Sequence, residues 1–402
     1  MKILVFNCGS SSIKFQLIDM PERTGLAKGK VECIGELESA FVCKCNGRQR
    51  TDPLSIANHS AAIQCILRAL TDGTTKVLNS LDEIGAVGHR VVHGGEAFTD
   101  SVLINDDVIA SIEQMADLAP LHNPPNLIGI RIAQQELPKV PQVACFDTAF
   151  HATIPEVAFI YGLPYELYEK YGIRRYGFHG TSHRWVARRA AALLGKQKYD
   201  INCITCHLGN GCSITAIKNG RSVDTSMGLT PLEGVVMGTR SGNFDPGILF
   251  YLADKGYDIV TLKALCNKQS GLLGISGTSN DMRILTEKAQ QGDDRAALAV
   301  DVFCYRIKKY IGMYAAVLGQ LDAVVFTGGI GENAVSVRAQ IGIGLEALGI
   351  EFDVQRNQQA AGIESEISCP ESRVKVLVIP TDEEQAIAGD THELAVQTIA
   401  NA

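Results

Sequence analysis

The sequence contains no long hydrophobic run. No stretch of about 18 consecutive apolar residues occurs in it, whereas a helix that crosses a bilayer needs roughly 20. The first residues enter an apolar, strand-like run directly, without the basic and then apolar layout of a signal peptide. We therefore expect a cytoplasmic protein that does not act in a membrane.

The sequence also lacks an excess of basic residues. Its 37 Lys and Arg residues are outnumbered by 44 Asp and Glu residues, which gives a net charge of −7. A protein that binds nucleic acid normally presents a basic face to the phosphate backbone. The composition therefore argues against nucleic acid as a partner, while local basic sites for small anions stay open.

Cysteine motifs of metal and haem sites are absent or misplaced. Cys43 and Cys45 have no second pair at zinc-finger spacing. Cys203, Cys206 and His207 fit the C-x-x-C-H pattern of covalent haem, but they lie in an apolar run typical of a strand. We expect neither a zinc site nor a haem, and we expect the 12 cysteines to be reduced and mostly buried thiols.

What the sequence does contain is enough apolar material for more than one core. It has 402 residues, of which 46% are hydrophobic and 20% charged. These are the proportions of an ordinary globular protein, and the length exceeds that of a single core. Two domains are therefore expected.

The N-terminal stretch is predicted to form a hairpin that binds phosphate. Residues 2–6 and 13–18 read as strands, and residues 7–12, N-C-G-S-S-S, read as a tight turn. Small side chains let backbone N–H groups approach an anion, the serines add hydroxyl donors, and Lys14 adds a cation. Taken alone, the stretch fits an ordinary Gly/Ser turn equally well.

A second stretch repeats this pattern about 200 residues later. Residues 201–206 form an apolar run, residues 207–212 form a Gly/Asn turn, and residues 213–217 form a returning run. Two such units indicate two related domains that face each other, each with a phosphate loop.

Charged side chains follow two predicted strands of the first half. Arg90 comes directly after the apolar run 84–88 and before a Gly-rich loop, and Asp147 follows the run 143–146. Because ligand groups of α/β folds usually lie at such strand ends, we favour a functional role for Arg90. Asp147 is either a helix cap or a catalytic or metal-orienting acid.

One segment of the second half concentrates arginines and histidines. Residues 171–183 include His179 and His183, which are four residues apart, as in helical metal sites. Gly180 and a predicted N-cap at Ser182 argue against one helix that carries both histidines. A loop that faces phosphate is favoured instead.

Two Gly-rich segments and one long helix complete the pattern. Arg240 lies in an unstructured stretch, residues 227–246, of a length that is usually functional. The run 323–326 leads into a T-G-G-I-G-E-N turn, where N–H groups and a helix dipole can bind a nucleotide. The helix at about 293–318 carries an apolar stripe that we expect in the core, with part of it available to a partner subunit.

Together these motifs resemble the acetate kinase family, within the actin and hexokinase superfamily of ATPases. The matching segments follow one another along the whole chain: NCGSSSIKF at 7–15, GHRVVHGG at 88–95, APLHNPP at 119–125, FDTAFH at 146–151, RRYGFHGTSH at 174–183, CHLGNG at 206–211, DTSMGLTPLEG at 224–234, MGTRSG at 237–242, SGLLGISGTSND at 270–281, FTGGIGEN at 326–333 and IPTDEE at 379–384.

The resemblance implies a fold and a reaction. The fold is an α/β fold with two duplicated ribonuclease-H-like domains and an active-site cleft between them, usually in a homodimer. The N-terminal domain would span 1–150 and include the C-terminal helix 384–402, and the nucleotide-binding domain would span 151–383. The reaction is reversible, direct in-line phosphoryl transfer between ATP and a short-chain carboxylate, with Mg²⁺ or Mn²⁺, to give ADP and an acyl phosphate.

The resemblance also assigns residues to roles. The catalytic residues would be Asp147, as the family's proposed acid or base, His179 and Arg240. The substrate residues would be Arg90, Val92, Leu121, His122, Phe178 and Pro231. The metal residues would be Asn7 and Glu383. The nucleotide residues would be Ser10, Ser12, Lys14, His207, Leu208, Gly209, Asn210, Gly211, Asp281, Met282, Arg283, Gly329, Ile330, Gly331, Glu332 and Asn333.

Physical chemistry changes one of these roles. A carboxylate substrate is already ionised near neutral pH, so no proton has to be removed from it. We therefore predict that Asp147 orients Arg90 or the hydrated magnesium and does not act as a base.

Two positions bear on specificity and on the metal. Related propionate kinases tend to carry alanine at the position of Val92, so valine favours acetate. Asp382 stands where the family commonly has asparagine, beside the proposed metal residue, and so adds negative charge there.

Three alternatives remain. The nearest is a kinase for propionate or another short-chain carboxylate. A non-catalytic ATP-binding switch is disfavoured because Arg90, His179 and Arg240 are all present. A sugar kinase would need a base for a neutral hydroxyl, but not paired arginines.

Overall fold

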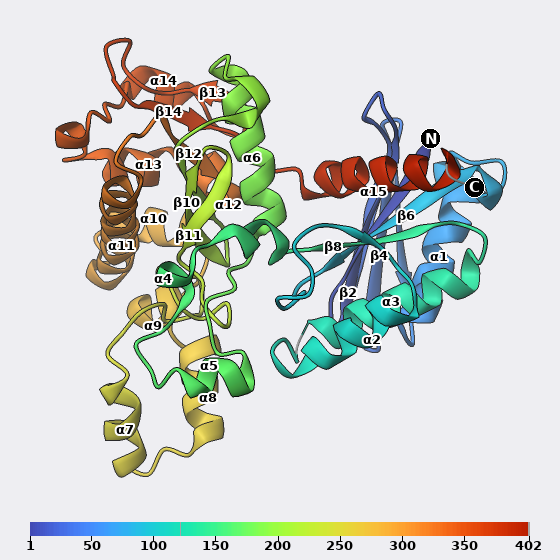
Figure 1. Cartoon of the computed structure of the whole chain (residues 1–402), viewed down its shortest axis with the longest axis horizontal. Coiled ribbons are helices and arrows are strands. Elements are labelled where there is room, and N and C mark those ends of the chain that lie inside the picture. The colour runs from blue at the N-terminus through green and yellow to red at the C-terminus, as the bar shows by residue number, and fades with distance from the viewer. Residues whose placement is uncertain (121, 401–402) are drawn as a thin grey trace. The chain divides into compact units, whose positions relative to one another are not determined.

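The computed structural model describes residues 1–120 and 122–400 and contains two compact units (Figure 1). The first consists of Met1–Ala152 together with Asp382–Ala402, and the second of Thr153–Thr381. Each unit contains one mixed β-sheet. No helix in these ranges is long and apolar enough to cross a membrane.

The first unit is built on a sheet with the strand order β5-β4-β3-β2-β1-β6-β8-β7. Strands β1 to β5 form an antiparallel meander, β6 and β8 run parallel to β1, and β7 is antiparallel to β8. Its elements are β1 (Lys2–Cys8), β2 (Ser12–Asp19), β3 (Thr24–Glu32), β4 (Ser39–Cys45), β5 (Arg48–Leu54), α1 (His59–Thr71), β6 (Ile84–Val91), β7 (Val102–Leu103), α2 (Asp106–Gln114), α3 (Asn123–Glu136), β8 (Gln142–Phe146) and α15 (Glu383–Ala400).

Helices cover both faces of this sheet. Alternate residues of β1 and β2 pack with α1 and α3 in one apolar cluster, which includes Leu4, Phe6 and Phe15. The residues between them, such as Ile3 and Val5, pack with α15 in another cluster. This two-sided burial explains why β1 reads as a nearly continuous apolar run.

The second unit has a sheet with the order β11-β10-β9-β12-β14-β13. Strands β9, β10 and β11 are antiparallel neighbours, and β12 and β14 run parallel to β9. Its strands are β9 (Cys203–Leu208), β10 (Cys212–Lys218), β11 (Arg221–Thr225), β12 (Ala323–Thr327), β13 (Ser365–Glu366) and β14 (Lys375–Val378). Its helices are α4 (Glu156–Phe159), α5 (Glu166–Tyr171), α6 (Gly180–Leu193), α7 (Gly247–Asp254), α8 (Ile259–Lys268), α9 (Gly271–Ser276), α10 (Met282–Gln290), α11 (Asp294–Leu318), α12 (Gly328–Asn333), α13 (Val335–Gly342) and α14 (Val354–Gln359).

The long helix α11 packs on β10 and β9. Its apolar stripe is buried within the second unit, including Val300, Phe303, Ile307, Ile311 and Leu318. The prediction that this stripe belongs to the core is therefore confirmed.

The two sheets repeat one topology. The order β3-β2-β1-β6-β8 of the first sheet has the same strand directions as β11-β10-β9-β12-β14 of the second. The predicted hairpins at 2–18 and 201–217 are the equivalent β1–β2 and β9–β10 pairs. The expected α/β architecture with two duplicated sheets is thus confirmed.

Two helix starts differ from the prediction. Helix α3 begins at Asn123, in the predicted loop, because its two prolines occupy the first turn, where a missing N–H group is tolerated. Helix α6 begins at Gly180, and its N-cap is His179 in the left-handed conformation. The predicted cap at Ser182 was wrong, because that hydroxyl instead bonds His207 and Thr381.

Candidate active site

Three predicted site residues lie at the carboxyl edge of the first sheet. Asn7, Arg90 and Asp147 end or follow the neighbouring parallel strands β1, β6 and β8. Each follows, by two positions, a residue on the face of the sheet that packs against α15. Val5 and Cys145 belong to the apolar cluster between the sheet and α15, and a side chain at Gly88 would meet α15. Because side chains alternate along a strand, all three are placed on that face of the sheet.

Asp147 holds the guanidinium of Arg90 in a fork. Arg90 Nε donates to Asp147 Oδ1 at 3.0 Å, and Arg90 Nη2 donates to Oδ2 at 2.6 Å. The side chain of Asp147 is only 2% exposed, whereas that of Arg90 is 20% exposed. Such a bidentate pair fixes both the position and the plane of the guanidinium.

Glu383, the first residue of α15, adds a second carboxylate. Its Oε2 lies 3.6 Å from Arg90 Nη1. Burial raises the pKa of Glu383, although Arg90 acts in the opposite direction. Burial alone would lower the pKa of Arg90, but Asp147 and Glu383 outweigh it and raise that pKa. The cluster therefore combines a fixed cation with a carboxylate that a further cation would stabilise.

The β1–β2 turn follows Asn7 and Cys8 at the same edge of the sheet. Asn7 pairs with Lys14 across the hairpin, and Gly9 N donates to Ser12 O at 2.8 Å. Ser10 and Lys14 are exposed. His59 Nε2 bonds Gly9 O at 2.7 Å, which fastens the turn to α1.

Residues that the sequence analysis missed hold the loop after β6. Asn126 Oδ1 accepts from Val92 N at 3.1 Å, Asn123 Oδ1 accepts from His93 N at 3.1 Å, and Thr148 Oγ1 accepts from Gly94 N at 3.0 Å. All three polar side chains are buried. Their positions inside the matching segments 119–125 and 146–151, or next to them, were the only signal in the sequence.

Asp382 acts as a helix cap. Its Oδ1 accepts from Gln385 N at 2.9 Å, in the first turn of α15. Asparagine and aspartate cap helices about equally well, so the departure from the family's asparagine preserves this contact. Burial raises the pKa of Asp382.

In the second unit, His179 lies within a chain of polar contacts. Its Nδ1 is 2.9 Å from Ser213 Oγ, and His183 Nε2 is 2.7 Å from the same oxygen. His183 Nδ1 in turn is 2.6 Å from Thr205 Oγ1. His179, the N-cap of α6, and His183, in its first turn, thus share a hydroxyl group, which fixes the ring of His179.

The ring of His179 also stacks on His207 of β9. Their centroids are 4.3 Å apart. The hairpin turn that follows His207 is tight, with Gly209 N donating to Gly211 O at 3.1 Å. A side chain at Gly211 would come within 3.3 Å of Arg240 Nη2 and 3.4 Å of the His179 ring, so this turn brings both site residues against bare backbone.

Arg240 has no acidic partner among the residues that the structure describes. Within residues 1–120 and 122–400, no carboxylate lies within ion-pair distance of its guanidinium. Nη1 donates to Pro231 O at 2.7 Å, and burial lowers the pKa of Arg240. A half-buried cation beside a histidine and a Gly turn is a suitable site for an anion such as a phosphoryl group.

The T-G-G-I-G-E-N segment, predicted as a turn before a helix, differs from that prediction: Thr327 ends β12, and the next six residues already form helix α12. Glu332 Oε1 accepts from Gly328 N at 2.9 Å and from Thr381 N at 3.0 Å. The fully buried Arg338 supports the segment from behind, because it donates to Gly331 O and Glu332 O at 2.8 Å each. No motif in the sequence marks Arg338, which donates to backbone carbonyls and to the amide oxygen of Asn357.

The remaining predicted nucleotide residues lie at the start of α10. Asp281 caps this helix and pairs with Arg283 at 2.6 Å. Met282 is buried, whereas the side chain of Arg283 is largely exposed. Asn280 Nδ2 reaches Asn210 Oδ1 at 3.1 Å, which links this segment to the β9–β10 turn.

The predicted acyl pocket draws on both units. Val92 and His122 belong to the first unit, and Phe178 and Pro231 belong to the second. Leu121 lies outside the described residues. That these side chains form one pocket stays a prediction.

The donor set at Asn7 and Glu383 suits a hard cation. An amide oxygen and a carboxylate are ligands that Mg²⁺ accepts, with its other positions filled by water and substrate phosphates. No group of three His, Cys, Asp or Glu residues that could hold a metal occurs in the described part of the chain. Asn7 and Glu383 would be the few protein ligands of such a metal.

Comparisons with known proteins give one consistent match. The model of the acetokinase family matches residues 2–389. An acetate kinase of Methanosarcina acetivorans is 55% identical over 396 residues, which is 98% of this chain and 97% of that protein. The crystal structure of an acetate kinase from Porphyromonas gingivalis superposes with a TM-score of 0.94 at 48% identity and covers 98% of this chain and 99% of its own. A propionate kinase from Francisella tularensis gives 0.92 at 46% identity, with the same coverage.

Proposed function

This chain belongs to the acetokinase family and transfers phosphoryl groups to a carboxyl group, and we propose that it does so with ATP and acetate through the two clusters described above. The observation that carries the proposal is the fork between Asp147 and Arg90, which prepares a fixed guanidinium for a carboxylate. The reaction is ATP + acetate ⇌ ADP + acetyl phosphate. A carboxylate oxygen attacks the γ-phosphorus, and the bond to the bridging oxygen of ADP breaks.

The positive groups of the site match the charge of this reaction. In phosphoryl transfer, charge lies on the equatorial oxygens of the transferring group, and catalysis is mainly positioning and electrostatics. Arg90 binds the carboxylate, while Arg240 and His179 stabilise the transferring group. Each is held by its own contacts before substrate arrives, so little reorganisation is needed.

Asp147 has an orienting role in this proposal. Acetate is ionised at neutral pH, so the attacking oxygen carries no proton to remove. Both carboxylate oxygens of Asp147 already accept hydrogen bonds from Arg90, which is the arrangement that an orienting group requires.

Asn7 and Glu383 would hold Mg²⁺, which neutralises phosphate charge when bound. Ser10, Ser12 and Lys14, together with the turn at 207–211, would contact the ATP phosphates. The segments 281–283 and 329–333 would contact the nucleoside end.

Glu383→Gln is expected to raise the Mg²⁺ concentration for half-maximal activity by about 10-fold or more, since even the loss of a group that only supports a metal ligand lowers metal affinity by about 10–100-fold. Burial raises the pKa of Glu383, so as the pH falls this side chain becomes protonated at a higher pH than an ordinary glutamate does. The Mg²⁺ concentration that the wild type requires should therefore increase toward acidic pH. Magnesium titrations at several pH values measure both effects.

Asp382→Asn is the matched control, because asparagine preserves the cap of α15. Its Mg²⁺ requirement should change less than that of Glu383→Gln, because a neighbouring charge is removed but no proposed metal ligand. An unchanged requirement in Glu383→Gln would remove Glu383 from the metal site.

Val92→Ala is expected to raise activity on propionate relative to acetate. One methylene group in an apolar pocket is worth about 1–3 kcal/mol, so propionate should be a poorer substrate of the wild type without being excluded. The ratio of kcat/KM for the two acids measures the effect. An unchanged ratio would take Val92 out of the pocket.

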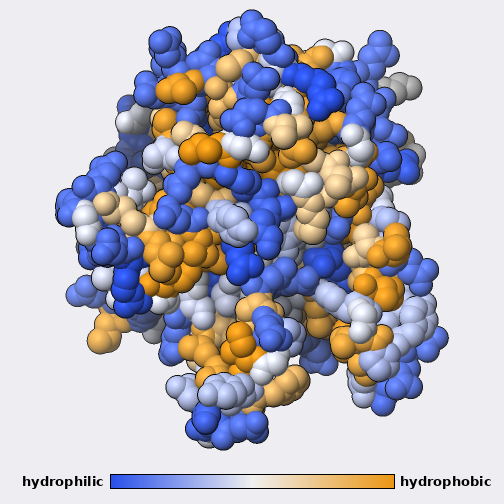
Figure 2. Space-filling model, turned by 90° about the vertical axis from the view of Figure 1, so that its left-hand side faces the viewer, coloured by the Kyte–Doolittle hydropathy of each residue, from blue (hydrophilic) through white to orange (hydrophobic). Residues whose placement is uncertain are grey.

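We also propose that the chain forms a homodimer. The apolar stripe of α11 is buried within its own unit, so the proposal rests on the exposed side of this helix. The other side of α11 exposes Leu298, Tyr305, Met313 and Val317, and α7 exposes Phe250 and Tyr251. Hydrophobic patches reach the surface on the face shown in Figure 2. Exposed apolar residues grouped on one helix favour a protein partner, and sedimentation at micromolar concentration should show a dimer.

Trapping of acyl phosphate with hydroxylamine tests the function itself. Acetate should give the largest rate, propionate a smaller one and butyrate the smallest. ATP binding without any acyl phosphate would favour the non-catalytic switch, and a higher rate on propionate would favour the propionate kinase.

A further inference from the structure

The position of the Arg240 guanidinium depends on the backbone of a neighbouring turn. Arg240 Nη1 donates to Pro231 O at 2.7 Å. Both residues lie in the stretch between β11 and α7, which forms no helix or strand. Whatever fixes the backbone near Pro231 therefore also fixes Arg240.

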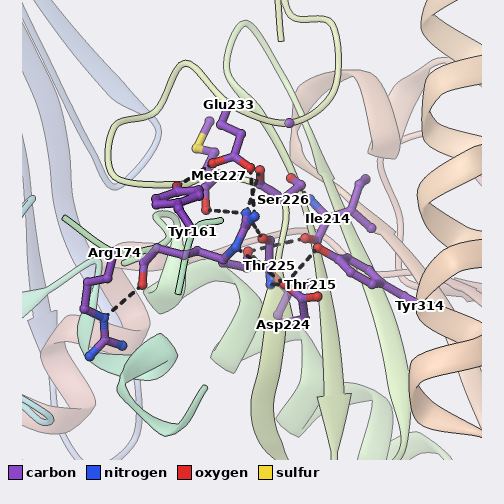
Figure 3. A network of polar contacts seen from close by, with 12 residues as sticks. Tyr161, Arg174, Ile214, Thr215, Asp224, Thr225, Ser226, Met227, Glu233 and Tyr314 are labelled. Atoms are coloured by element: carbon purple, nitrogen blue, oxygen red, sulfur yellow. Dashed lines mark hydrogen bonds and ion pairs between the residues drawn. The ribbon is translucent and has the colours of Figure 1, made fainter. Parts of the chain in front are cut away.

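Glu233 and Tyr161 hold this backbone on both sides of Pro231. Tyr161 Oη accepts from Leu229 N at 2.9 Å and donates to Glu233 Oε2 at 2.5 Å. Arg175 Nη2 donates to Glu233 Oε1 at 2.7 Å. Both oxygens of Glu233 are thus engaged, as the dashed lines in Figure 3 show.

Arg175 ties this turn to the end of β11. Its Nη1 donates to Thr225 O at 2.7 Å, with Ser226 O at 3.3 Å and Met227 O at 3.4 Å. The side chains of Arg175 and Glu233 are 16% and 28% exposed. Arg175 also precedes His179 by only four residues, and Tyr176 N and Gly177 N donate to Gly228 O at 3.2 Å each.

We propose that Glu233, with Arg175 and Tyr161, is a positioning residue that sets the carbonyl of Pro231 and, through it, the guanidinium of Arg240. The inference rests on the proposed function, in which Arg240 stabilises the transferring phosphoryl group. A displacement of about 1 Å in such a group can lower the rate by about 10²-fold.

Glu233→Gln tests this role because glutamine keeps the shape of the side chain and removes its charge. We expect kcat/KM for acetate to fall by about 10–100-fold, while KM for ATP changes little and the thermal midpoint falls modestly, because the partly buried Arg175 loses its counter-ion. Glu364→Gln is the matched control: Glu364 pairs with Arg189 of α6 at 2.7 Å, in the same unit but away from the 226–246 stretch. It should leave all of these values unchanged.

A double variant separates positioning from general damage. In an Arg240→Lys background, which removes the fork that Pro231 anchors, Glu233→Gln should cause a clearly smaller further loss than it causes alone. Tyr161→Phe, which removes both of its contacts without changing charge, should give a smaller selective loss and serves if Glu233→Gln does not fold.

The outcomes distinguish the two levels of the proposal. A wild type that forms no acetyl phosphate would count against the proposed function. An active wild type with an unaffected Glu233→Gln, or with losses that multiply fully in the Arg240→Lys background, would overturn the positioning role.

Discussion

Arg240→Ala should lower kcat for acetyl phosphate formation by about 10³-fold or more, the size of effect seen when an arginine that stabilises a transferring phosphoryl group is removed. Its guanidinium lies beside His179 and the Gly211 backbone and has no acidic partner in the described chain. Its charge is therefore available to an anion. Because no buried carboxylate loses its partner, the thermal midpoint should change little.

Arg240→Lys is the informative control for this prediction. Lysine keeps the charge but cannot donate to Pro231 O and to a phosphoryl oxygen from one rigid fork. Its kcat should lie between those of the wild type and Arg240→Ala at saturating ATP and acetate. A loss below about 10-fold in Arg240→Ala would remove this residue from the transition state.

Arg90→Ala should lower both activity and stability. The activity falls because the carboxylate loses its bidentate partner, by about 10²–10³-fold for one lost group of this kind. The stability falls because Asp147, 2% exposed, is left without its counter-ion. For a buried pair that loss is about 3–5 kcal/mol, and roughly 2–4 kcal/mol is expected here because the Arg90 side chain is 20% exposed.

The double variant Arg90→Ala with Asp147→Asn isolates the second effect. Removal of the stranded charge should recover part of the lost stability without any recovery of activity. Urea unfolding of the single and double variants measures the first quantity, and acyl phosphate trapping the second. Equal stability of Arg90→Ala and the wild type would show that the fork does not stabilise the buried side chain of Asp147.

Local patterns in the sequence were sufficient for the hairpins and for the residues at strand ends. The β1–β2 and β9–β10 pairs follow from apolar runs around small polar turns, and Arg90 and Asp147 were found because each comes at the end of a buried apolar run, Arg90 within the last residues of β6 and Asp147 directly after β8. These features depend on neighbours in sequence, so periodicity and turn chemistry predict them.

The supporting contacts were not predictable in this way. Ser213, Asn126 and Arg338 act through hydrogen bonds to residues far away in sequence or to carbonyls that no motif marks. The start of α6 was wrong for the same reason, since Ser182 Oγ is engaged by Thr381, 199 residues away. Polar residues in such networks look like ordinary surface residues until the fold brings their partners close.

The central claim is that this protein transfers a phosphoryl group to a carboxylate that is already ionised, with Asp147 orienting Arg90. If so, the acid–base behaviour of Asp147 plays no part in the transfer. Asparagine at this position keeps one oxygen for Arg90 but lacks the charge that fixes the fork.

The most direct test is therefore the pH–rate profile of Asp147→Asn for acetyl phosphate formation. We expect a lower kcat at every pH, with the same limbs as the wild type, because only the orientation of Arg90 is weakened. A limb that is present in the wild type and missing in Asp147→Asn would identify Asp147 as a general base and contradict the account.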